Sequence, residues 1–381
     1  MEQNAFDLLS LSLVPGLGST RTARLLQRAG EPGALFRMSR AELKALGLST
    51  EIQYYLLGGW ARKDAESALK SAAEKGIGIL TRFDADYPPL LSQIFDPPLV
   101  LYYLGRAEIL RKPAVAVVGS RRCSVYGSEV AFTLARDLVR HGLVVVSGLA
   151  LGIDGQAHQG ALSEGGETVA VLGTGVDVVY PRSHRKLYRC IRDEGCVISE
   201  CPLGAFPAPQ NFPIRNRIIA GLSLGTVIPD ASEFSGSLIT ARLTLEQDRE
   251  LWAVPGNITN PGSYGPNHLI KQGARPVLDA KDVLENLPVH VLHALKEALD
   301  ASGSCKEPAP EEAAILGLLR VEEAEPFDRL LARSGRNITD LSGILVSLEA
   351  QGLVRSLPGR RYSRRLVTVS SSKKERARGR N

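Results

Sequence analysis

The central part of the chain alternates between short apolar segments and longer amphipathic ones. The apolar segments are four to six residues long and rich in Val, Ile and Leu, a pattern typical of strands that are buried on both faces. They lie at 114–119, 143–148, 168–173, 196–200, 225–230, 251–256 and 275–278. Helical patterns lie between them, at 127–141, 153–164, 184–194, 214–223, 237–247 and 266–273. This alternation predicts an α/β fold with a Rossmann-like, doubly wound parallel sheet, which we assign to residues 75–288.

The residues before this region follow a different pattern. Residues 1–70 predict a small N-terminal helical domain, similar to a SAM or helix-hairpin-helix module, because the turn Pro15-Gly16-Leu17-Gly18 precedes a helix. Backbone N–H groups at such a glycine-rich helix start suit a phosphate. The same hairpin is equally typical of two helices that only pack against each other, and the sequence favours neither role.

The residues after position 288 predict a second, smaller folded part. We expect a linker at 289–310, a C-terminal winged helix of three helical segments and an arginine-rich hairpin at 311–369, and an unstructured basic tail at 370–381. Residues 353–381 carry ten Lys or Arg and a single acid, while the whole chain has a net charge of +5. The positive charge therefore belongs to this end of the chain, where it favours polyanions but also serves as a solubilising terminus.

Composition and length limit the class of protein. A chain of 381 residues with 44% hydrophobic content is expected to form two or three domains. It has no apolar run of roughly 20 residues and no basic segment at its start, so we expect neither a membrane span nor a signal peptide. Its five cysteines are scattered and form no C-x-x-C motif, which favours a cytoplasmic protein without a disulfide framework or a metal site. We also expect no cofactor.

Three polar clusters fall at junctions between a predicted strand and the following helix. They are Ser120-Arg121-Arg122, Arg215-Asn216-Arg217 and Ser235-Gly236-Ser237. Such junctions meet at the carboxyl edge of a doubly wound sheet, where helix N-termini, backbone N–H groups and arginine side chains together form an anion site. Gly119 is followed by arginines and not by the glycines of a dinucleotide fingerprint. Arginines at these places suit the separated phosphates of a nucleic acid strand.

One further pair of residues has the types needed for catalysis. Asp154 and His158 are four residues apart in a predicted helix, so they share one helical face and could act as an acid–base couple. No nucleophile motif, metal-ligand cluster or Walker lysine accompanies them. We therefore favour a structural role, in which Asp154 caps the helix that begins near Gly155 and His158 forms a buried hydrogen bond.

Several motifs in order resemble the DNA-processing protein A (DprA, also called Smf) family. They cover about residues 75–280 and comprise VAVVGSRRCSVYG, VVSGLALGIDGQAHQGAL, VLGTGVDVVYPRSHRKLY, ECPLGAFPAPQNFPIRNRIIAGLS, SGSLITARLTLEQDRELWAVPG and GPNHLIKQGA. The resemblance implies a cytoplasmic homodimer that binds and protects single-stranded DNA during natural transformation and helps load the recombinase RecA onto it. It implies no catalytic activity. It leaves open whether the winged helix binds duplex DNA or a protein.

The resemblance also implies which residues contact DNA. Carried over motif by motif, they are Gly119, Ser120, Arg121, Arg215, Asn216, Arg217, Ser235, Gly236, Ser237 and Asn267. We add Arg122, Phe234 and Lys271 to the predicted DNA contacts. Two positions depart from the family pattern: Asp230-Ala231 stands where Glu-Ala is common, and Phe234 stands where a basic residue is common. Phe234 could stack on a base or pack in the interior.

Two other functions fit the same fold class. Rossmann-like nucleotide-cleaving phosphoribohydrolases carry a Pro-Gly-Gly-x-Gly-Thr stretch, which VLGTGVD imitates only in part. A DNA-nicking enzyme would need an acidic metal cluster, which the sequence lacks. A non-catalytic single-stranded DNA-binding protein is therefore the leading prediction.

Overall fold

The computed structural model describes residues 2–302, 309–320, 324–350, 353–357 and 359–364. The chain divides into two compact units, residues 1–302 and 303–381, and each is described by itself. Among the described helices, none combines the length and the apolar character needed to cross a membrane.

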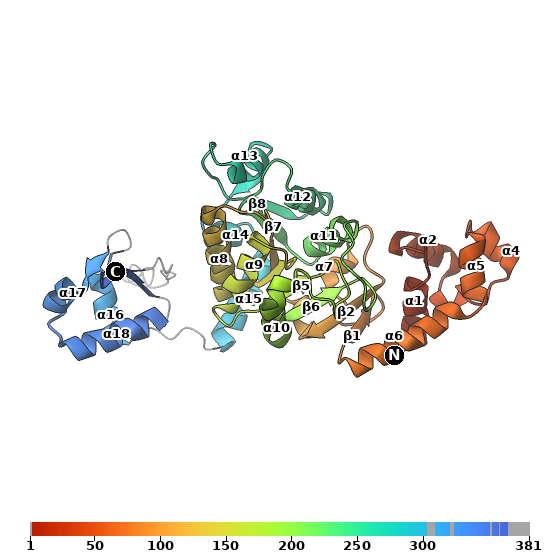
Figure 1. Cartoon of the computed structure of the whole chain (residues 1–381), viewed down its shortest axis with the longest axis horizontal. Helices are drawn as coiled ribbons and strands as arrows, with labels where there is room; N and C mark the ends of the chain where they lie inside the picture. Colours follow the sequence, from red (N-terminus) through yellow and green to blue (C-terminus); the bar gives the residue numbers. More distant parts are fainter. Residues whose placement is uncertain (1, 303–308, 321–323, 351–352, 358, 365–381) are drawn as a thin grey trace, which may run out of the picture. The chain divides into compact units, whose positions relative to one another are not determined.

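A nine-stranded sheet lies at the centre of the first unit, in the order β1-β2-β6-β5-β4-β3-β7-β8-β9 (Figure 1). Its strands are β1 (Gly78–Thr81), β2 (Val100–Gly105), β3 (Ala114–Val117), β4 (Val144–Ser147), β5 (Thr168–Val171), β6 (Cys196–Ser199), β7 (Gly225–Ile228), β8 (Glu250–Ala253) and β9 (Arg275–Pro276). Strands β3 to β9 pair in parallel, whereas β1 and β2 form an antiparallel edge. The predicted doubly wound sheet is confirmed, with two antiparallel strands added at one edge.

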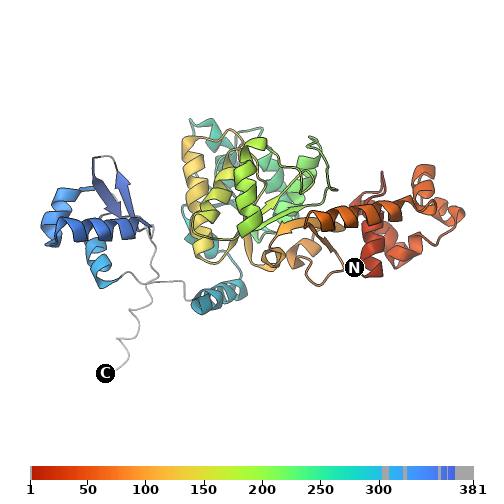
Figure 2. The ribbon, with the colours of Figure 1, turned by 60° about the horizontal axis from the view of Figure 1, so that its bottom comes forward.

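Helices cover both faces of the sheet (Figures 1 and 2). One face carries α7 (Pro89–Ser92), α11 (Asn211–Gly221), α12 (Ser237–Glu246) and α13 (Tyr264–Lys271). The other carries α8 (Val125–Arg140), α9 (Ile153–Leu162), α10 (Arg185–Glu194), α14 (Ala280–Leu284) and α15 (Val289–Ser302). Alternate residues of β3 point into the two cores, Ala116 into the first and Val115 and Val117 into the second. Strands β3 to β7 are buried along their whole length, which explains the continuous Val-rich runs.

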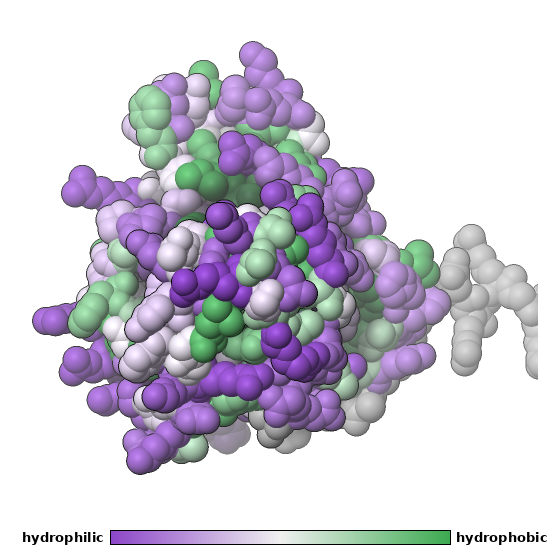
Figure 3. All heavy atoms as spheres, turned by 90° about the vertical axis from the view of Figure 1, so that its right-hand side faces the viewer, coloured by the Kyte–Doolittle hydropathy of each residue, from purple (hydrophilic) through white to green (hydrophobic). Residues whose placement is uncertain are grey.

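Six helices precede the sheet and pack against its antiparallel edge. They are α1 (Gln3–Ser12), α2 (Ser19–Ala29), α3 (Pro32–Leu35), α4 (Arg40–Ala45), α5 (Thr50–Leu57) and α6 (Trp60–Glu74). They have a core of their own, and a second cluster joins Leu8 of α1 and Ala65 of α6 to Tyr102 of β2. The surface on this side of the molecule is mainly hydrophilic, with small apolar patches (Figure 3). The helices expected at the start of the chain are present, and they belong to the same compact unit as the sheet, against which they bury apolar surface.

The expected linker begins too early. We assigned residues 289–310 to it, but Val289–Ser302 form helix α15 and belong to the first compact unit. Val291 and Leu295 are buried in the same core as α8. These two positions lie four residues apart, so one helical turn aligns them toward the sheet. The second half of the expected linker is rich in Gly, Ser and Pro, and this composition hides the helical spacing of the first half.

The second unit is a small winged helix with its own core. It contains α16 (Pro310–Leu318), α17 (Phe327–Ser334) and α18 (Ile338–Ala350), together with a three-stranded sheet in the order β10 (Glu325–Pro326), β12 (Arg361–Arg364) and β11 (Val354–Leu357). Strand β10 lies between α16 and α17 in the chain, and β11 and β12 follow α18. Ile315, Leu330 and Leu345 lie among its buried residues. The basic tail predicted at 370–381 lies outside the described residues.

Candidate nucleic-acid interface

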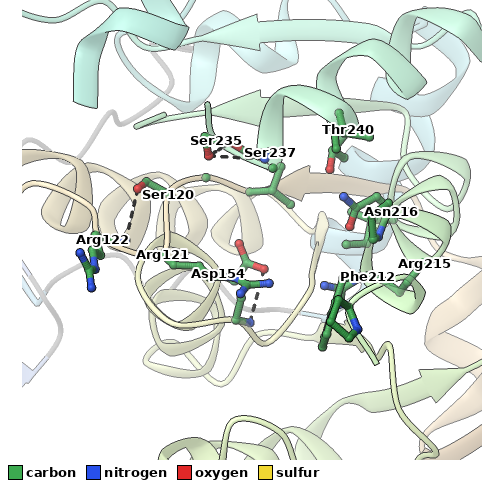
Figure 4. A pocket seen from close by; sticks show the side chains of 18 of the residues that line it. Ser120, Arg121, Arg122, Asp154, Phe212, Arg215, Asn216, Ser235, Ser237 and Thr240 are labelled. Atoms are coloured by element: carbon green, nitrogen blue, oxygen red, sulfur yellow. Dashed lines mark hydrogen bonds between the residues drawn. The ribbon is translucent and has the colours of Figure 1, made fainter. Parts of the chain in front are cut away.

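A cleft of about 610 Å³ opens at the carboxyl edge of the sheet (Figure 4). It lies where β3 sits between β4 and β7. The chain that leaves β3 passes to the α8 face and the chain that leaves β7 passes to the α12 face, so the two connections separate and leave a crevice. Its lining includes Gly119, Ser120, Arg121, Arg122, Asp154, Tyr180, Phe212, Arg215, Asn216, Ser235, Gly236, Ser237 and Thr240. Nine of the thirteen predicted DNA contacts therefore meet in one cavity.

The turn after β3 is fixed by its backbone. The Ser120 N–H donates to the Asp230 carbonyl at 2.8 Å, and the Ile153 N–H donates to the Ser120 carbonyl at 3.2 Å. A Cβ at position 119 would lie 2.5 Å from the Asp230 carbonyl oxygen, so only glycine fits there. The Asp230 carboxylate also accepts hydrogen bonds from the N–H (3.0 Å) and hydroxyl (2.7 Å) groups of Ser124. The end of β7 thereby holds the turn in place.

Arg121 and Arg122 extend from this turn into solvent. Both side chains are exposed, and neither forms an ion pair with any residue that the structure describes. The Arg121 guanidinium lies 5.5 Å from the centre of the Phe212 ring, which lies 5.6 Å from the Tyr180 ring. The rim of the cleft therefore combines free positive charge with two aromatic faces.

Phe212 and Tyr180 were missed in the sequence. Both stand inside the motifs quoted above, NFPIRNR and VVYPRSH, each next to or near a proline. An aromatic residue directly before a proline near a strand-to-helix junction is the signal that could have identified them, because such junctions lie at the carboxyl edge of the sheet and proline is tolerated in the first turn of a helix.

Arg215 does not play the part expected of it. Its side chain is buried and donates hydrogen bonds to the carbonyls of Gly148, at 2.8 Å, and Val171. Burial lowers the pKa of Arg215 to about 10, against the opposing effect of the Asp154 carboxylate. We expected a guanidinium that grips a phosphate, whereas the structure shows one that joins the ends of β4 and β5 beneath the cleft.

The other two residues of the Arg-Asn-Arg motif point in different directions, and one of them lines the cleft. Arg217 is buried away from the cleft, with its Nη2 2.6 Å from the Glu200 carboxylate and its Nε 3.0 Å from Asp96. Asn216 lines the cleft, and its side chain makes no hydrogen bond within the described part of the chain. Consecutive residues of a helix lie about 100° apart around its axis, so a triplet on α11 cannot present all three side chains to one groove. Of the three, Asn216 is the residue free to contact a ligand.

The start of α12 forms the opposite wall. The hydroxyls of Ser235 and Ser237 are 2.8 Å apart, and a Cβ at Gly236 would meet no atom within 4 Å. The N–H groups of Ser237, Leu238 and Ile239 already donate to the Ser235 hydroxyl and to the carbonyls of Ser235 and Gly236. The Gly236 N–H donates to no residue in the described part of the chain, so it is available to an anion at this helix start. Phe234 is 91% exposed and is absent from the cleft lining. This exposure excludes the packing role considered above.

Asn267 and Lys271 lie on α13, outside the cleft. The Asn267 amide accepts a hydrogen bond from the Gly256 N–H at 3.1 Å and donates one to the Gly256 carbonyl at 2.9 Å. It holds the loop that follows β8. Lys271 is the exposed last residue of α13. The structure therefore does not bring either residue to the predicted site.

Asp154 and His158 have separate partners. The Asp154 carboxylate accepts from the N–H groups of Gly148 (3.2 Å) and Ala150 (3.4 Å), so it fixes the loop before α9 and does not cap the helix. Burial raises the pKa of Asp154, and Arg215 counteracts this effect. Nδ1 of His158 lies 2.7 Å from the hydroxyl of Thr168. Burial lowers the pKa of His158 to about 3, so the ring is neutral. These contacts favour a structural role for both residues.

Comparison with known proteins gives a consistent result. A family model described as DNA recombination-mediator protein A matches residues 78–288, and a model of the DprA winged helix domain matches residues 300–360. Protein Smf from Escherichia coli (strain K12) is 37% identical over 360 residues, which cover 92% of this chain and 93% of that protein. DNA processing protein A (DprA) from Streptococcus pneumoniae has an X-ray structure that matches with a TM-score of 0.67 and 34% identity, over 76% of this chain and 100% of that chain. A structure describing the single-stranded DNA binding mode of DNA processing protein A from Helicobacter pylori matches with a TM-score of 0.50 and 30% identity, over 58% of this chain and 96% of that one.

Proposed function

Because the chain belongs to the DNA recombination-mediator protein A family, we propose that it binds single-stranded DNA in the cleft and acts as a recombination mediator in natural transformation. The observation that carries this proposal is the exposed Arg121, which has no ion-pair partner among the described residues and lies over Phe212 at the cleft rim. The Helicobacter pylori relative, whose structure describes single-stranded DNA binding, supports it.

The chemistry of the cleft suits a DNA strand without regard to its sequence. A guanidinium and the Gly236 N–H at the start of α12 can bind phosphate oxygens, which every nucleotide carries. Phe212 and Tyr180 offer ring faces on which any base can stack. We therefore expect an affinity that falls steeply with salt and depends little on base sequence.

Further parts of the proposal rest on the family alone. We propose that the protein works in the cytoplasm as a homodimer and that it helps RecA to assemble on the bound strand. Mixing RecA, the protein and single-stranded DNA tests this step: we expect faster RecA filament formation with the protein than without it. An unchanged rate would contradict RecA loading and leave DNA binding intact.

A catalytic role has less support. A nucleotide-cleaving enzyme would need an acid and a base facing a substrate, and Asp154 and His158 are instead bound to loop N–H groups and to Thr168. Within the described ranges, no group of three His, Cys, Asp or Glu is arranged to hold a metal ion. We therefore propose binding without catalysis.

The experiment that tests DNA binding is a titration of oligo-dT against wild type, Arg121→Ala and Arg121→Lys. Loss of one charge-assisted hydrogen bond costs about 1.5–3 kcal/mol, so we expect Arg121→Ala to bind about 10- to 100-fold more weakly. Arg121→Lys should recover only part of the affinity, since lysine lacks the bidentate fork.

Arg242→Ala is the matched control. Arg242 is an exposed arginine on α12 that pairs with Glu246 at 3.3 Å and does not line the cleft. Its loss should leave oligo-dT affinity nearly unchanged, and circular dichroism should confirm that each variant is folded. Wild-type affinity in a folded Arg121→Ala protein would contradict the proposed site.

A further inference from the structure

A basic surface begins beside the cleft and continues along helix α10. We define the α10 ridge as Arg182, Arg185, Lys186 and Arg189. All four side chains are exposed, and none forms an ion pair with a residue in the described part of the chain. Arg185, Lys186 and Arg189 lie on α10 (Arg185–Glu194), where spacings of three and four residues place Arg185 and Lys186 beside Arg189. Arg182 lies in the short 3-10 helix Arg182–His184 directly before α10. No acidic residue occurs from 178 to 192.

Several other cations of the first unit are neutralised by acidic partners, which the ridge lacks among the residues that the structure describes. Arg140 pairs with Glu164 at 2.7 Å, and Arg106 pairs with Glu167 at 2.9 Å. Asp193, the first acid beyond the ridge, is bound by Arg192 at 2.7 Å. Like charges three and four residues apart destabilise a helix. A polyanion that bound the ridge would relieve this repulsion.

The opposite face of α10 fixes the ridge toward solvent. Leu187, Tyr188 and Ile191 are buried with residues of β5 and β6. The Tyr188 hydroxyl also donates a hydrogen bond to the Val176 carbonyl. The helix therefore cannot rotate to bring the four cations inward. Figure 2 shows α10, in green, on the outer side of the sheet on the face that comes forward.

The ridge is continuous with the cleft. Tyr180 lines the cleft and precedes the ridge by two residues. Nδ1 of His184, within the ridge segment, lies 3.0 Å from the carbonyl of Leu149, next to Ala150 in the cleft wall. A strand that passed Phe212 and Tyr180 would reach Arg182 next.

We propose that the α10 ridge binds the phosphates of single-stranded DNA where the strand leaves the cleft. This inference rests on the proposed function and extends it, because it gives the path of the strand beyond the cavity. The ridge rises about 6 Å along α10 from Arg185 to Arg189, and Arg182 lies in the 3-10 turn before it, so the ridge is long enough for more than one phosphate. An acidic protein surface is the competing occupant, but it would not explain why the ridge begins at the cleft wall.

The test compares two lengths of oligo-dT, about 6 and about 30 nucleotides, so that only the longer one can leave the cleft. The variant is Arg185→Ala, Lys186→Ala, Arg189→Ala. We expect its affinity for the longer oligomer to fall at least about tenfold, and the slope of log K against log salt to become shallower by about 2, since three phosphate contacts are lost. Affinity for the shorter oligomer should not change.

Arg40→Ala, Lys44→Ala, Lys70→Ala is the control variant. It removes the same charge from exposed positions of the same unit, away from the cleft. A fall in affinity equal to that of the ridge variant would show a general charge effect and overturn the proposal. Wild-type affinity of the ridge variant for the longer oligomer would also overturn it and leave an acidic protein as the occupant. Equal losses for both oligomers would contradict a contact outside the cleft.

Arg121→Ala separates this inference from the proposed function. If the cleft binds DNA, Arg121→Ala weakens both oligomers, whatever the ridge variant does. If Arg121→Ala weakens neither, the proposed function itself fails.

Discussion

The rim and the floor of the cleft use arginine in opposite ways. On the rim, Arg121 is exposed, and its guanidinium lies 5.5 Å from the centre of the Phe212 ring. On the floor, Arg215 is buried and bound to two backbone carbonyls beside Asp154. Both residues belong to motifs that the family resemblance associates with DNA. The difference shows that an arginine at a binding site is available to the ligand only where the protein leaves its guanidinium without partners.

The largest expected effect concerns the floor. Arg215→Ala removes the positive partner of the buried Asp154 and frees two buried carbonyls, so we expect a loss of about 3–5 kcal/mol in the free energy of unfolding. Arg121→Ala should change that free energy by less than about 0.5 kcal/mol, because Arg121 is exposed. Urea denaturation of both variants measures the contrast. Equal unfolding free energies for the two variants would contradict the proposed difference between the floor and the rim of the cleft.

A smaller effect should distinguish two phenylalanines. Phe212→Ala removes a ring from the cleft, so oligo-dT affinity should fall by about 1–3 kcal/mol, the range for stacking on one base. Phe234 is more exposed but does not line the cleft, so Phe234→Ala should bind almost as wild type does. The same titration measures both. A larger loss for Phe234→Ala would place the stacking surface outside the cavity.

A third effect is absent at neutral pH and appears only in acid. His158 has a pKa of about 3 in the folded protein and about 6.5 when unfolded, so the unfolded state binds the extra proton first as the pH falls. Its contribution to stability is therefore complete above pH 6.5 and is lost toward pH 3, by about 1.4 kcal/mol per pH unit.

His158→Gln should flatten this part of the pH dependence of the unfolding free energy, and the exposed His290→Gln should not. If His158→Gln kept the wild-type slope, the titration of another group would be responsible.

Much of the fold could be predicted because the local signals agree with the tertiary structure. Strands β3, β4 and β5 are buried on both faces, so their Val-rich segments are visible without knowledge of their neighbours. The position of the cleft followed from topology, since the carboxyl ends of parallel strands share one edge. These features depend on the order of elements and not on the rotation of any one helix.

The roles of single residues could not be predicted in the same way. Whether position 215, 216 or 217 faces the cleft depends on how α11 is rotated, and that rotation is set by Ile218 and Ile219 in the core. The Asn267 amide could bind either a phosphate or a loop of the protein. Its role depends on how close the folded chain brings it to Gly256. Such choices arise from contacts between residues far apart in the sequence.

The backbone bonds around Ser120 have a consequence for the thermodynamics of binding. Because Asp230 and Ile153 already hold the turn, a ligand at the rim has no loop to order and meets a preorganised receptor. The conformational entropy lost on binding then comes from ordering the side chains of Arg121 and Arg122 and the DNA strand itself. Free and bound forms should accordingly share one backbone, and association should be limited by diffusion and orientation, not by a change of fold.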